Sequence, residues 1–472
     1  MNIERLYQLF LRHPSIQTDT RKLKGGDLFF ALKGPNFNGN QFAIRALELG
    51  AAYAVIDEPP HTSEPTTPEY PAGPPTQQIP GSLSERLILV DDVLTTLQAL
   101  ALHHRRQFDI PFIAITGSNG KTTTKELVHA VLSSTYITYT TEGNLNNHIG
   151  VPLTLLSVKK DAQFAVIEMG ANHQKEIEGY CQYTLPTHGI ITNAGKAHLE
   201  GFGGPAGVKK GKGELYTFLR ENNGTAFVMW DYDYLREMSK GIPHIVRYGT
   251  ADAEITGVVD QGNPVTQQNP AGEADSLLRV HITGGASTGI ISTQLVGDYN
   301  LPNVLVAVTV GKHFGVPDDL IRQSIAAYTP SNSRSQLIRR DSNHIILDAY
   351  NANPSSMKAA IDNFARMSTS SPGNPGTANP VTAPSHKVLI LGAMAELGEE
   401  SLEEHRQIVD LIGKYPWRQV VLVGGDFLRT PHPYLNFKNS REAGDWLRQA
   451  GLTDTWLLIK GSRSTKMEEV LI

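Results

Sequence analysis

Cysteine is nearly absent from this chain of 472 residues, in which Cys181 stands alone. A single cysteine excludes an internal disulfide, and such scarcity is typical of a protein that works in a reducing cytoplasm. No motif around Cys181 supports the alternative of a nucleophile. We therefore interpret Cys181 as a structural thiol.

A large excess of one charge and long apolar runs are also missing. Lysine and arginine total 42 against 47 aspartates and glutamates, which leaves a formal net charge of -5. This balance does not indicate a nucleic acid or an acidic membrane as partner. The chain lacks a run of the roughly 18 apolar residues that a membrane helix needs, and its first residues lack the apolar core of a secretory signal. We expect a cytoplasmic protein with no membrane span.

The length predicts about three domains, at a usual size of about 150 residues each. We place them at residues 1–108, 109–329 and 330–472. Proline-rich stretches at 58–82 and 368–385 offer little to bury, so we interpret them as surface insertions in the first and last domains. A proline-rich ligand for a partner is the alternative for 58–82.

The apolar patterns predict an α/β fold in all three domains. We expect a small mixed α/β module, then a central doubly wound, mainly parallel sheet like that of P-loop ATPases, then a Rossmann-like α/β domain. In the first module the expected elements are strands at 28–32 and 51–56 and a helix at 42–49 with Phe42, Ala46 and Leu49 inward. Further strands are expected at 112–115, 164–167, 189–192, 345–347, 388–391, 420–423 and 456–459. Helices are expected to open at 209–216 and at 296–303.

The stretch from Phe112 to Ser133 reads as a buried strand, a glycine-rich loop and an amphipathic helix. Such a loop turns backbone N–H groups and the positive end of a helix toward an anion, so it predicts a phosphate site. Lys121 would reach the outer phosphates of ATP, and the Thr122 hydroxyl would bind Mg²⁺. The full Walker pattern has a glycine where Ile115 stands, so the match is to a shortened loop. The alternative is a plain turn with a solvated Lys121.

Two polar residues follow later strands of the same domain. Glu168 ends one strand, and a carboxylate at that position beside a phosphate loop is a candidate magnesium ligand. His198 follows the next strand, where a metal or phosphate role and a purely structural role are both open. The lysines at 209, 210 and 212 are normally a solvated face, with binding of an anionic substrate as the alternative.

Several motifs together resemble the Mur ligase family over nearly the whole chain outside the two insertions. They are DTR at 19–21, GDLFFALKG at 26–34, TGSNGKTTTKE at 116–126, GNLNNHIGVPLTLL at 143–156, EMGAN at 168–172, DAYNANPSSM at 348–357, ELGEES at 396–401 and KGSRSTKMEEV from residue 460. The sequence departs from the family pattern at Ala393, where an acid is usual, and before Arg334, where PSNS replaces Pro-Gly.

The resemblance implies a monomeric, ATP- and Mg²⁺-dependent ligase that forms an amide through an acyl phosphate. Within the family it points to the branch that adds D-alanyl-D-alanine to UDP-N-acetylmuramoyl-tripeptide for peptidoglycan synthesis. The first domain would hold the uridine nucleotide and the central one ATP, while the last would close over both and help bind the dipeptide.

The resemblance also implies roles for individual residues. Those expected to be catalytic are Lys121, His198 and Lys212. Those expected to bind ATP are Thr116, Gly117, Ser118, Asn119, Gly120, Lys121, Thr122, Thr123, Asn300, Arg334, Asp348 and Asn351. Those expected to bind the UDP substrate are Asp19, Thr20, Arg21, Asn144 and Asn147. The expected metal ligands are Thr122, Glu168, His198 and Lys212, the last after carbamylation by CO₂.

Other functions remain open on the sequence alone. The nearest is another ligase of the same family, either one that adds a diamino acid or one like folylpolyglutamate synthetase. A P-loop kinase or transport ATPase would leave the DTR and DAYNANP motifs unexplained. A noncatalytic nucleotide-binding module would leave Lys121, Glu168, His198 and Lys212 without a purpose.

Overall fold

The computed structural model describes residues 2–59, 81–260, 277–331, 333–367 and 386–472. The chain divides into two compact units that alternate along the sequence. The first unit comprises Met1–Ile113, Ile137–Met169 and Gly179–Pro186, and the second comprises Ala114–Tyr136, Gly170–Glu178 and Thr187–Ile472. The insertion expected at 368–385 and most of that at 58–82 lie outside the described residues.

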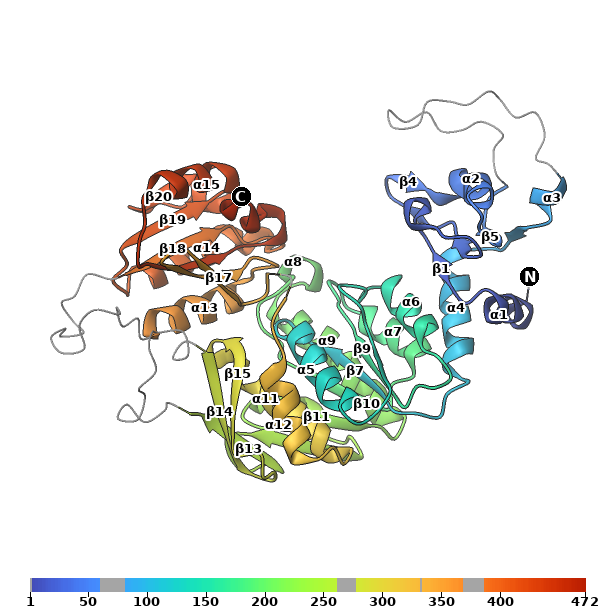
Figure 1. Ribbon diagram of the computed structural model, residues 1–472, viewed down its shortest axis with the longest axis horizontal. Helices are drawn as coiled ribbons and strands as arrows, with labels where there is room; N and C mark the ends of the chain where they lie inside the picture. Colours follow the sequence, from blue (N-terminus) through green and yellow to red (C-terminus); the bar gives the residue numbers. More distant parts are fainter. Residues whose placement is uncertain (1, 60–80, 261–276, 332, 368–385) are drawn as a thin grey trace. The chain divides into compact units, whose positions relative to one another are not determined.

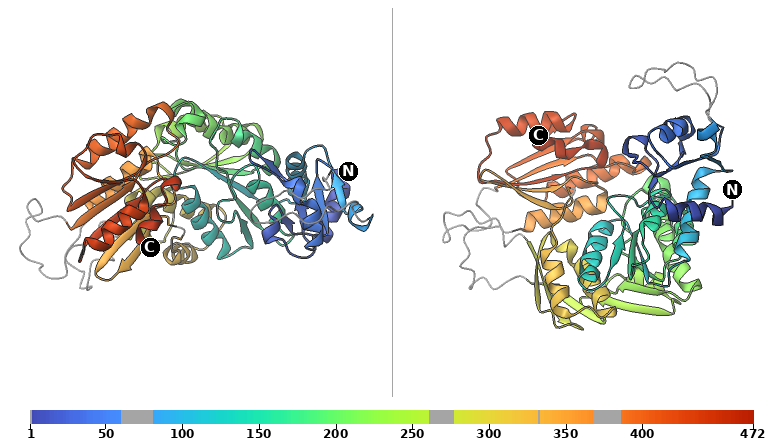
Figure 2. Two further views of the ribbon diagram at one scale, coloured as in Figure 1. Left: turned by 90° about the horizontal axis from the view of Figure 1, so that it is seen from above. Right: turned by 45° about the vertical axis from the view of Figure 1, so that its right-hand side comes forward.

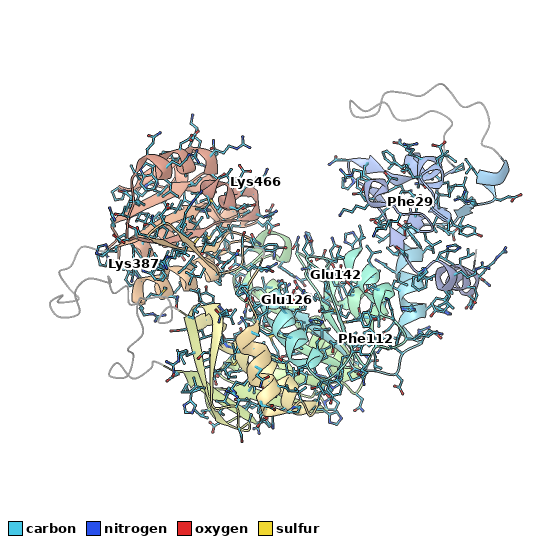
Figure 3. The ribbon with its side chains drawn as sticks, viewed as in Figure 1. Phe29, Phe112, Glu126, Glu142, Lys387 and Lys466 are labelled. Atoms are coloured by element: carbon cyan, nitrogen blue, oxygen red, sulfur yellow. The ribbon has the colours of Figure 1, made fainter. Side chains whose placement is uncertain are left out.

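The first unit begins with a small parallel sheet in the order β1-β2-β5-β6. Its strands are β1 (Ile16–Gln17), β2 (Leu28–Phe30), β5 (Tyr53–Ile56) and β6 (Leu87–Leu89), and a hairpin of β3 (Lys33–Gly34) and β4 (Phe37–Asn38) lies between β2 and β5 in the sequence. Alternate residues such as Phe29, Ala54 and Ile56 pack with helix α2 (Ala43–Glu48), and Figure 3 labels Phe29.

The expected inward position of Leu49 is wrong, because that side chain is 44% exposed. Helix α2 ends at Glu48, and the chain then turns through Gly50, which has a φ of 102°. Leu49 therefore lies beyond the last helical residue and no longer follows the buried stripe of the helix. Ala46 is fully buried as expected.

The first unit also contains helices α1 (Ile3–Arg12), α3 (Gly81–Ser84), α4 (Val93–Arg105) and α6 (Gly150–Ser157). It is completed by the parallel strands β8 (Thr138–Thr140) and β9 (Phe164–Glu168) and by most of α7 (Glu176–Thr184). Arg105 fastens α4 to its surroundings, since its guanidinium donates to the carbonyls of Phe108, Thr184 and Leu185 and lies 3.8 Å from the centre of the Phe112 ring. A buried guanidinium needs such acceptors.

The central sheet of the second unit runs in the order β15-β14-β13-β12-β11-β10 and includes β7. The strands are β7 (Phe112–Thr116), β10 (His188–Ile191), β11 (Thr225–Met229), β12 (His244–Gly249), β13 (Ile255–Val259), β14 (Leu277–Gly284) and β15 (Ile290–Val296). Pairing is parallel from β10 to β13 and antiparallel from β13 to β15. The strands expected at 112–115, 164–167 and 189–192 are confirmed.

Helices cover both faces of this sheet (Figure 1). On one face lie α5 (Lys121–Ser133), α11 (Leu301–His313) and α12 (Asp318–Ala327), which pack against one another. On the other lie α9 (Pro205–Glu221) and α10 (Asp233–Ser239). Successive residues of β10 face the two helix layers in turn. A Cβ on Gly189 would meet α9, whereas the neighbouring His188 lies against α11. Helix α9 begins at Pro205, four residues before the start expected at 209, and proline favours a first helical turn.

The last part of the second unit is a sheet in the order β16-β17-β21-β18-β19-β20, parallel except for β16. Its elements are β16 (Gln336–Arg340), β17 (Asn343–Asp348), α13 (Pro354–Arg366), β18 (Lys387–Gly392), α14 (Ser401–Ile412), β19 (Gln419–Val423), β20 (Leu435–Phe437), α15 (Ser440–Gln449) and β21 (Trp456–Lys460). Helix α15 and the 3₁₀ turn Met467–Leu471 cover one face. Helix α13 lies on the opposite side of the sheet from α15 (Figure 1, and Figure 2 from other directions).

All four strands expected in this last domain are present, and the sheet is Rossmann-like as predicted. Within the part of the chain that the structure describes, no helix is both long and apolar enough to cross a membrane.

Candidate functional site

The loop between β7 and α5 depends on two glycines. Gly117 has a φ of 147° and Gly120 a φ of 80°, conformations that L side chains rarely adopt. A Cβ on Gly117 would lie 1.9 Å from Thr192 Oγ1, and one on Gly120 would lie 2.7 Å from Asn303 Oδ1. The loop therefore needs glycine at both positions for conformation and for space.

The residues after β10 hold this loop from the side. Ser118 donates from its backbone N to Asn193 O at 2.9 Å and from its hydroxyl to Gly195 O at 2.9 Å. Thr192 Oγ1 donates to Asn119 O at 2.6 Å, and Asn193 Nδ2 donates to the same oxygen at 3.0 Å. The loop shape is thus fixed by a segment more than 70 residues further along the chain.

The loop leads directly into a helix end that can hold an anion. Helix α5 has Gly120 as N-cap, with no side-chain hydrogen bond to cap its first turn. Lys121 Nζ folds back and donates to Gly117 O at 2.7 Å, while Thr122 is buried in the first turn. Backbone N–H groups, a positive helix end and a lysine together favour phosphate.

Lys212 lies in the second unit, as the loop does, and is only 1% exposed. Its Nζ donates to Ala171 O at 3.0 Å and lies 4.9 Å from the centre of the Phe202 ring. Burial lowers the pKa of Lys212 well below that of a free lysine, and the charge of Lys121 lowers it further. The expected solvated face holds only for Lys209 and Lys210, which are exposed.

Glu168, at the end of β9 in the first unit, is 1% exposed. Its Oε1 accepts a hydrogen bond from Asn146 Nδ2 at 2.7 Å, and its backbone N donates to Thr141 Oγ1 at 2.9 Å. Its other carboxylate oxygen, Oε2, is buried and has no hydrogen-bond partner among the described residues. A buried carboxylate oxygen with no hydrogen-bond donor beside it is suited to bind a cation.

His198 adopts a left-handed conformation, with a φ of 52°, at the start of the short helix α8 (Leu199–Phe202). Its Nδ1 lies 2.5 Å from Glu396 Oε2, and the hydrogen bond from His198 lowers the pKa of Glu396. Nearby, Lys196 Nζ contacts Glu404 Oε1 at 2.5 Å, and the Lys196 backbone N donates to Ser355 Oγ. These contacts join the segment after β10 to the last domain.

A ready-made metal centre is not visible, because no group of three or more His, Cys, Asp or Glu side chains in the described ranges is placed to hold a metal ion. The predicted ligand set would instead combine one carboxylate, one imidazole, one hydroxyl and one modified lysine. The orphaned oxygen of Glu168 fits such a set. Glu168 belongs to the first unit, and Thr122, His198 and Lys212 belong to the second.

Asn300 takes part in a buried chain of hydrogen bonds that reaches the loop. Its Nδ2 donates to Val296 O, and its Oδ1 accepts from Asn303 Nδ2 at 2.8 Å. Asn303 Oδ1 accepts in turn from Thr124 Oγ1 at 3.0 Å, on the first turns of α5. The amide of Asn300 is therefore engaged within the protein.

The residues expected to reach ATP from the last domain lie near one another. Arg334 stacks on Tyr350 with its guanidinium carbon 3.5 Å from the ring centre. Asp348 Oδ2 contacts Lys460 Nζ at 2.5 Å, and Asn351 O accepts from the same Nζ at 3.3 Å.

Three family descriptions match successive parts of the chain. "Mur ligase family, catalytic domain" matches residues 14–105, "Mur ligase middle domain" matches 115–311, and "Mur ligase, glutamate ligase domain" matches 333–463. The chain belongs to the Mur ligase family. The three-domain α/β architecture expected from the sequence is confirmed, while the boundaries at 108 and 329 stay predictions.

Individual relatives of this Mur ligase share one name. It is 31% identical to the UDP-N-acetylmuramoyl-tripeptide--D-alanyl-D-alanine ligase of Bacillus subtilis (strain 168), over 97% of this chain and 92% of that protein. It is 32% identical to the ligase of the same name from Escherichia coli (strain K12), with the same coverage. A crystal structure of MurF from Acinetobacter baumannii matches with a TM-score of 0.78 and 27% identity, covering 98% of this chain and 97% of that one.

The substrate residues predicted in the first unit of this Mur ligase lie on its surface or near it. Asp19 caps the 3₁₀ turn Thr20–Lys22 and forms a two-point contact with the Arg21 guanidinium, which lowers the pKa of Asp19. Asn144 is exposed, and Asn147 Oδ1 accepts from the backbone N of Gly150 at the start of α6. Their binding roles stay predictions.

Several partners of the predicted site residues of this Mur ligase are not apparent from the sequence. Asn146, which donates to Glu168, lies between Asn144 and Asn147 in the GNLNNHIG motif, and the motif alone does not predict this contact. Glu396 and Lys460 lie in the ELGEES and KGSRSTKMEEV motifs, which do not predict their contacts with His198 and Asp348. Each was visible as a polar residue within a family motif, and its partner became visible only in the fold.

Proposed function

We propose that this chain is an ATP-dependent ligase that adds D-alanyl-D-alanine to UDP-N-acetylmuramoyl-tripeptide in peptidoglycan precursor synthesis. The observation that carries the proposal is its similarity, at 31% identity along 97% of the chain, to a ligase of that name. The glycine loop, with Lys121 Nζ donating back to Gly117 O, supports the proposal because such a loop suits the phosphates of ATP.

The reaction takes place in two steps. A carboxylate oxygen of the tripeptide forms a bond to the γ-phosphorus of ATP as the bond to ADP breaks, which gives an acyl phosphate. The dipeptide amine then forms the C–N bond, loses a proton, and displaces inorganic phosphate. Negative charge meets negative charge in the first step, so Lys121 and the N–H groups in the uncapped first turn of α5 lower the barrier by stabilising the phosphate oxygens.

Magnesium would neutralise the phosphates when bound. Thr122, Glu168, His198 and carbamylated Lys212 would hold it. Carbamylation needs a neutral amine, which gains a bond to the carbon of CO₂ and loses a proton. The lowered pKa of Lys212 supports this modification because more of the amine is then neutral.

The domains at 1–108, 109–329 and 330–472 divide the work. The first holds the UDP-substrate through Asp19, Thr20 and Arg21, with Asn144 and Asn147 contributed from the central domain. The central domain holds ATP, and the last closes over it with Arg334, Asp348 and Asn351. Closure keeps water from the acyl phosphate. We propose a cytoplasmic monomer.

The decisive experiment measures phosphate release by the purified chain with ATP, Mg²⁺ and UDP-N-acetylmuramoyl-tripeptide. We expect release to require D-alanyl-D-alanine and the ligated pentapeptide product to appear by mass spectrometry. Release that depends on a diamino acid with a shorter muramyl peptide, or on glutamate with a folate, would assign the chain to another Mur-type ligase. Release without any acceptor would indicate a simple ATPase.

Lys121→Ala tests the phosphate site within the same assay. We expect kcat to fall by roughly a hundredfold or more, because a lysine that stabilises transferring phosphate is lost. The matched control is Lys210→Ala, which removes an exposed lysine of α9 and should leave kcat unchanged. Normal turnover by Lys121→Ala would contradict the assignment.

A further inference from the structure

Lys460, the last residue of β21, has a side chain that is only 2% exposed. A buried ammonium is costly unless it is paired and hydrogen-bonded. Its Nζ contacts Asp348 Oδ2 at 2.5 Å and donates to Asn351 O at 3.3 Å. Both acceptors belong to residues that the proposed function assigns to ATP binding.

The strand register brings these groups together. Strands β17 and β21 are parallel neighbours, and Asp348 is the direct partner of Lys460 across them. Both residues stand at the carboxyl ends of their strands, the edge where open α/β sheets bind ligands. The chain then continues from Asp348 through Asn351 to the start of α13.

The end of the Asp348 strand is also hydrogen-bonded to the segment that carries Arg334. Its Oδ1 accepts from the Ser335 backbone N at 3.2 Å, and Ser333 O accepts from the Ala349 backbone N at 2.9 Å. Ser333 and Ser335 have φ values of 54° and 49°, conformations that persist only where surrounding contacts hold them. The backbone on both sides of Arg334 is therefore tied to the Asp348 strand end.

Lys460 has its ammonium turned into the protein, so it does not present a charge to a ligand. We propose that Lys460 is a positioning residue, which fixes the Asp348 carboxylate and the Asn351 backbone, and through Asp348 the Arg334 segment, for nucleotide binding. This inference rests on the proposed function for the roles of Asp348, Asn351 and Arg334. It adds a residue that acts through them without touching ATP.

The test compares Lys460→Met with the wild-type chain. Methionine keeps the length and apolar stem of lysine but removes the charge and the donors. We expect the KM for ATP and the dissociation constant of a nonhydrolysable ATP analogue, measured by calorimetry, to rise roughly tenfold or more, because a buried charge pair is broken. The KM for D-alanyl-D-alanine should change less than the KM for ATP, and Lys460→Arg should recover part of the loss.

Lys387→Met is the matched control. Lys387, labelled in Figure 3, is a buried lysine of the same sheet, but it stands at the amino end of β18. Its Nζ donates to the carbonyls of Ala365 and Met367 at the end of α13. The Lys387→Met variant should lower the melting temperature as Lys460→Met does. It should leave both ATP measurements unchanged.

Equal melting-temperature losses with unchanged ATP analogue binding in both variants would overturn the proposal and leave Lys460 as a purely structural lysine. If Lys460→Met does not fold, Asp348→Asn combined with Lys460→Met removes both buried charges, and normal analogue binding by that variant would also overturn it. Analogue binding does not require ligation. A wild-type chain without D-alanyl-D-alanine-dependent phosphate release would therefore refute the proposed function separately.

Discussion

Single side chains in this protein are distinguished by their surroundings more than by their type. Lys209, Lys210 and Lys212 stand within four residues on one helix, yet only Lys212 is buried. Lys212 differs from its two neighbours because its Nζ donates to Ala171 O and lies over the Phe202 ring. Its altered pKa and its proposed modification follow from that burial.

His188 is a second single side chain whose surroundings matter, because it makes the free energy of unfolding depend on pH. It packs among Phe227, His313 and Phe314, and burial, followed by the nearby His313, lowers the pKa of His188 to about 4. The unfolded chain has an ordinary histidine pKa of about 6.5. Protonation therefore favours unfolding, so the stability due to neutral His188 is complete above pH 6.5 and is lost as pH falls toward 4.

We expect His188→Phe to remove part of the acid sensitivity of the unfolding free energy. Each unit of pKa difference is worth about 1.36 kcal/mol, so the effect between pH 6.5 and 4 is at most about 3 kcal/mol. Urea unfolding at several pH values measures it. His244→Phe, at the exposed start of β12, is the control, and identical pH slopes for wild type and His188→Phe would contradict the assignment.

At the scale of elements, the phosphate loop is a turn that only glycine can make. Gly117→Ala would force a Cβ to within 1.9 Å of Thr192 Oγ1 at a φ of 147°. We expect binding of an ATP analogue to weaken by at least about tenfold, since strain of a few kcal/mol has to be relieved by moving the loop. Calorimetric titration measures this.

Gly179→Ala is the matched control for the loop. Gly179 lies in α7, and a Cβ there would have no heavy atom within 4 Å. We expect this variant to keep normal binding and to gain up to about 1 kcal/mol of stability, because alanine is the better helix former. Equal binding by the two variants would show that the loop tolerates a side chain.

Elements were predictable where a local pattern specified them. Apolar runs predict β7, β9 and β10 and, in the last domain, β17, β18, β19 and β21, because a buried strand must be apolar wherever it packs. The less buried β16 and β20 carry no such run and are not predicted. The ends of elements were less predictable. Leu49 fell beyond the end of α2, and α9 began at Pro205, since a helix end depends on contacts and turn geometry outside the helix.

At the scale of the chain as a whole, the second unit joins distant segments through a few polar contacts. Asn353 Nδ2 donates to Asn119 Oδ1 at 2.8 Å, which connects the start of α13 to the phosphate loop across 234 residues. Asn353 is also the N-cap of α13, where its Oδ1 accepts from the Ser356 backbone N. One side chain therefore both caps a helix and contacts the loop.

Asn353→Asp separates these two tasks. Aspartate caps a helix as well as asparagine does, but it cannot donate to Asn119 Oδ1, so the 2.8 Å hydrogen bond is lost and only the longer one from Asn119 Nδ2, at 3.5 Å, can remain. We expect kcat/KM for ATP to fall roughly tenfold, a loss of about 1.4 kcal/mol, with little change in melting temperature. Asn439→Asp, at the N-cap of α15, should leave kcat/KM unchanged. A melting-temperature loss without a kinetic effect would reduce Asn353 to a cap.

Family membership, the glycine-rich loop after β7 and the apolar strands can be predicted from short runs of residues, because each depends on local physics. The hydrogen bond from Asn146 to Glu168, the pairing of Lys460 with Asp348 and the burial of Lys212 become visible only in the folded chain. Lys460 and Asp348 are 112 residues apart. Such pairs depend on strand register and on which faces pack, and these are fixed only when the whole chain has buried its apolar surface.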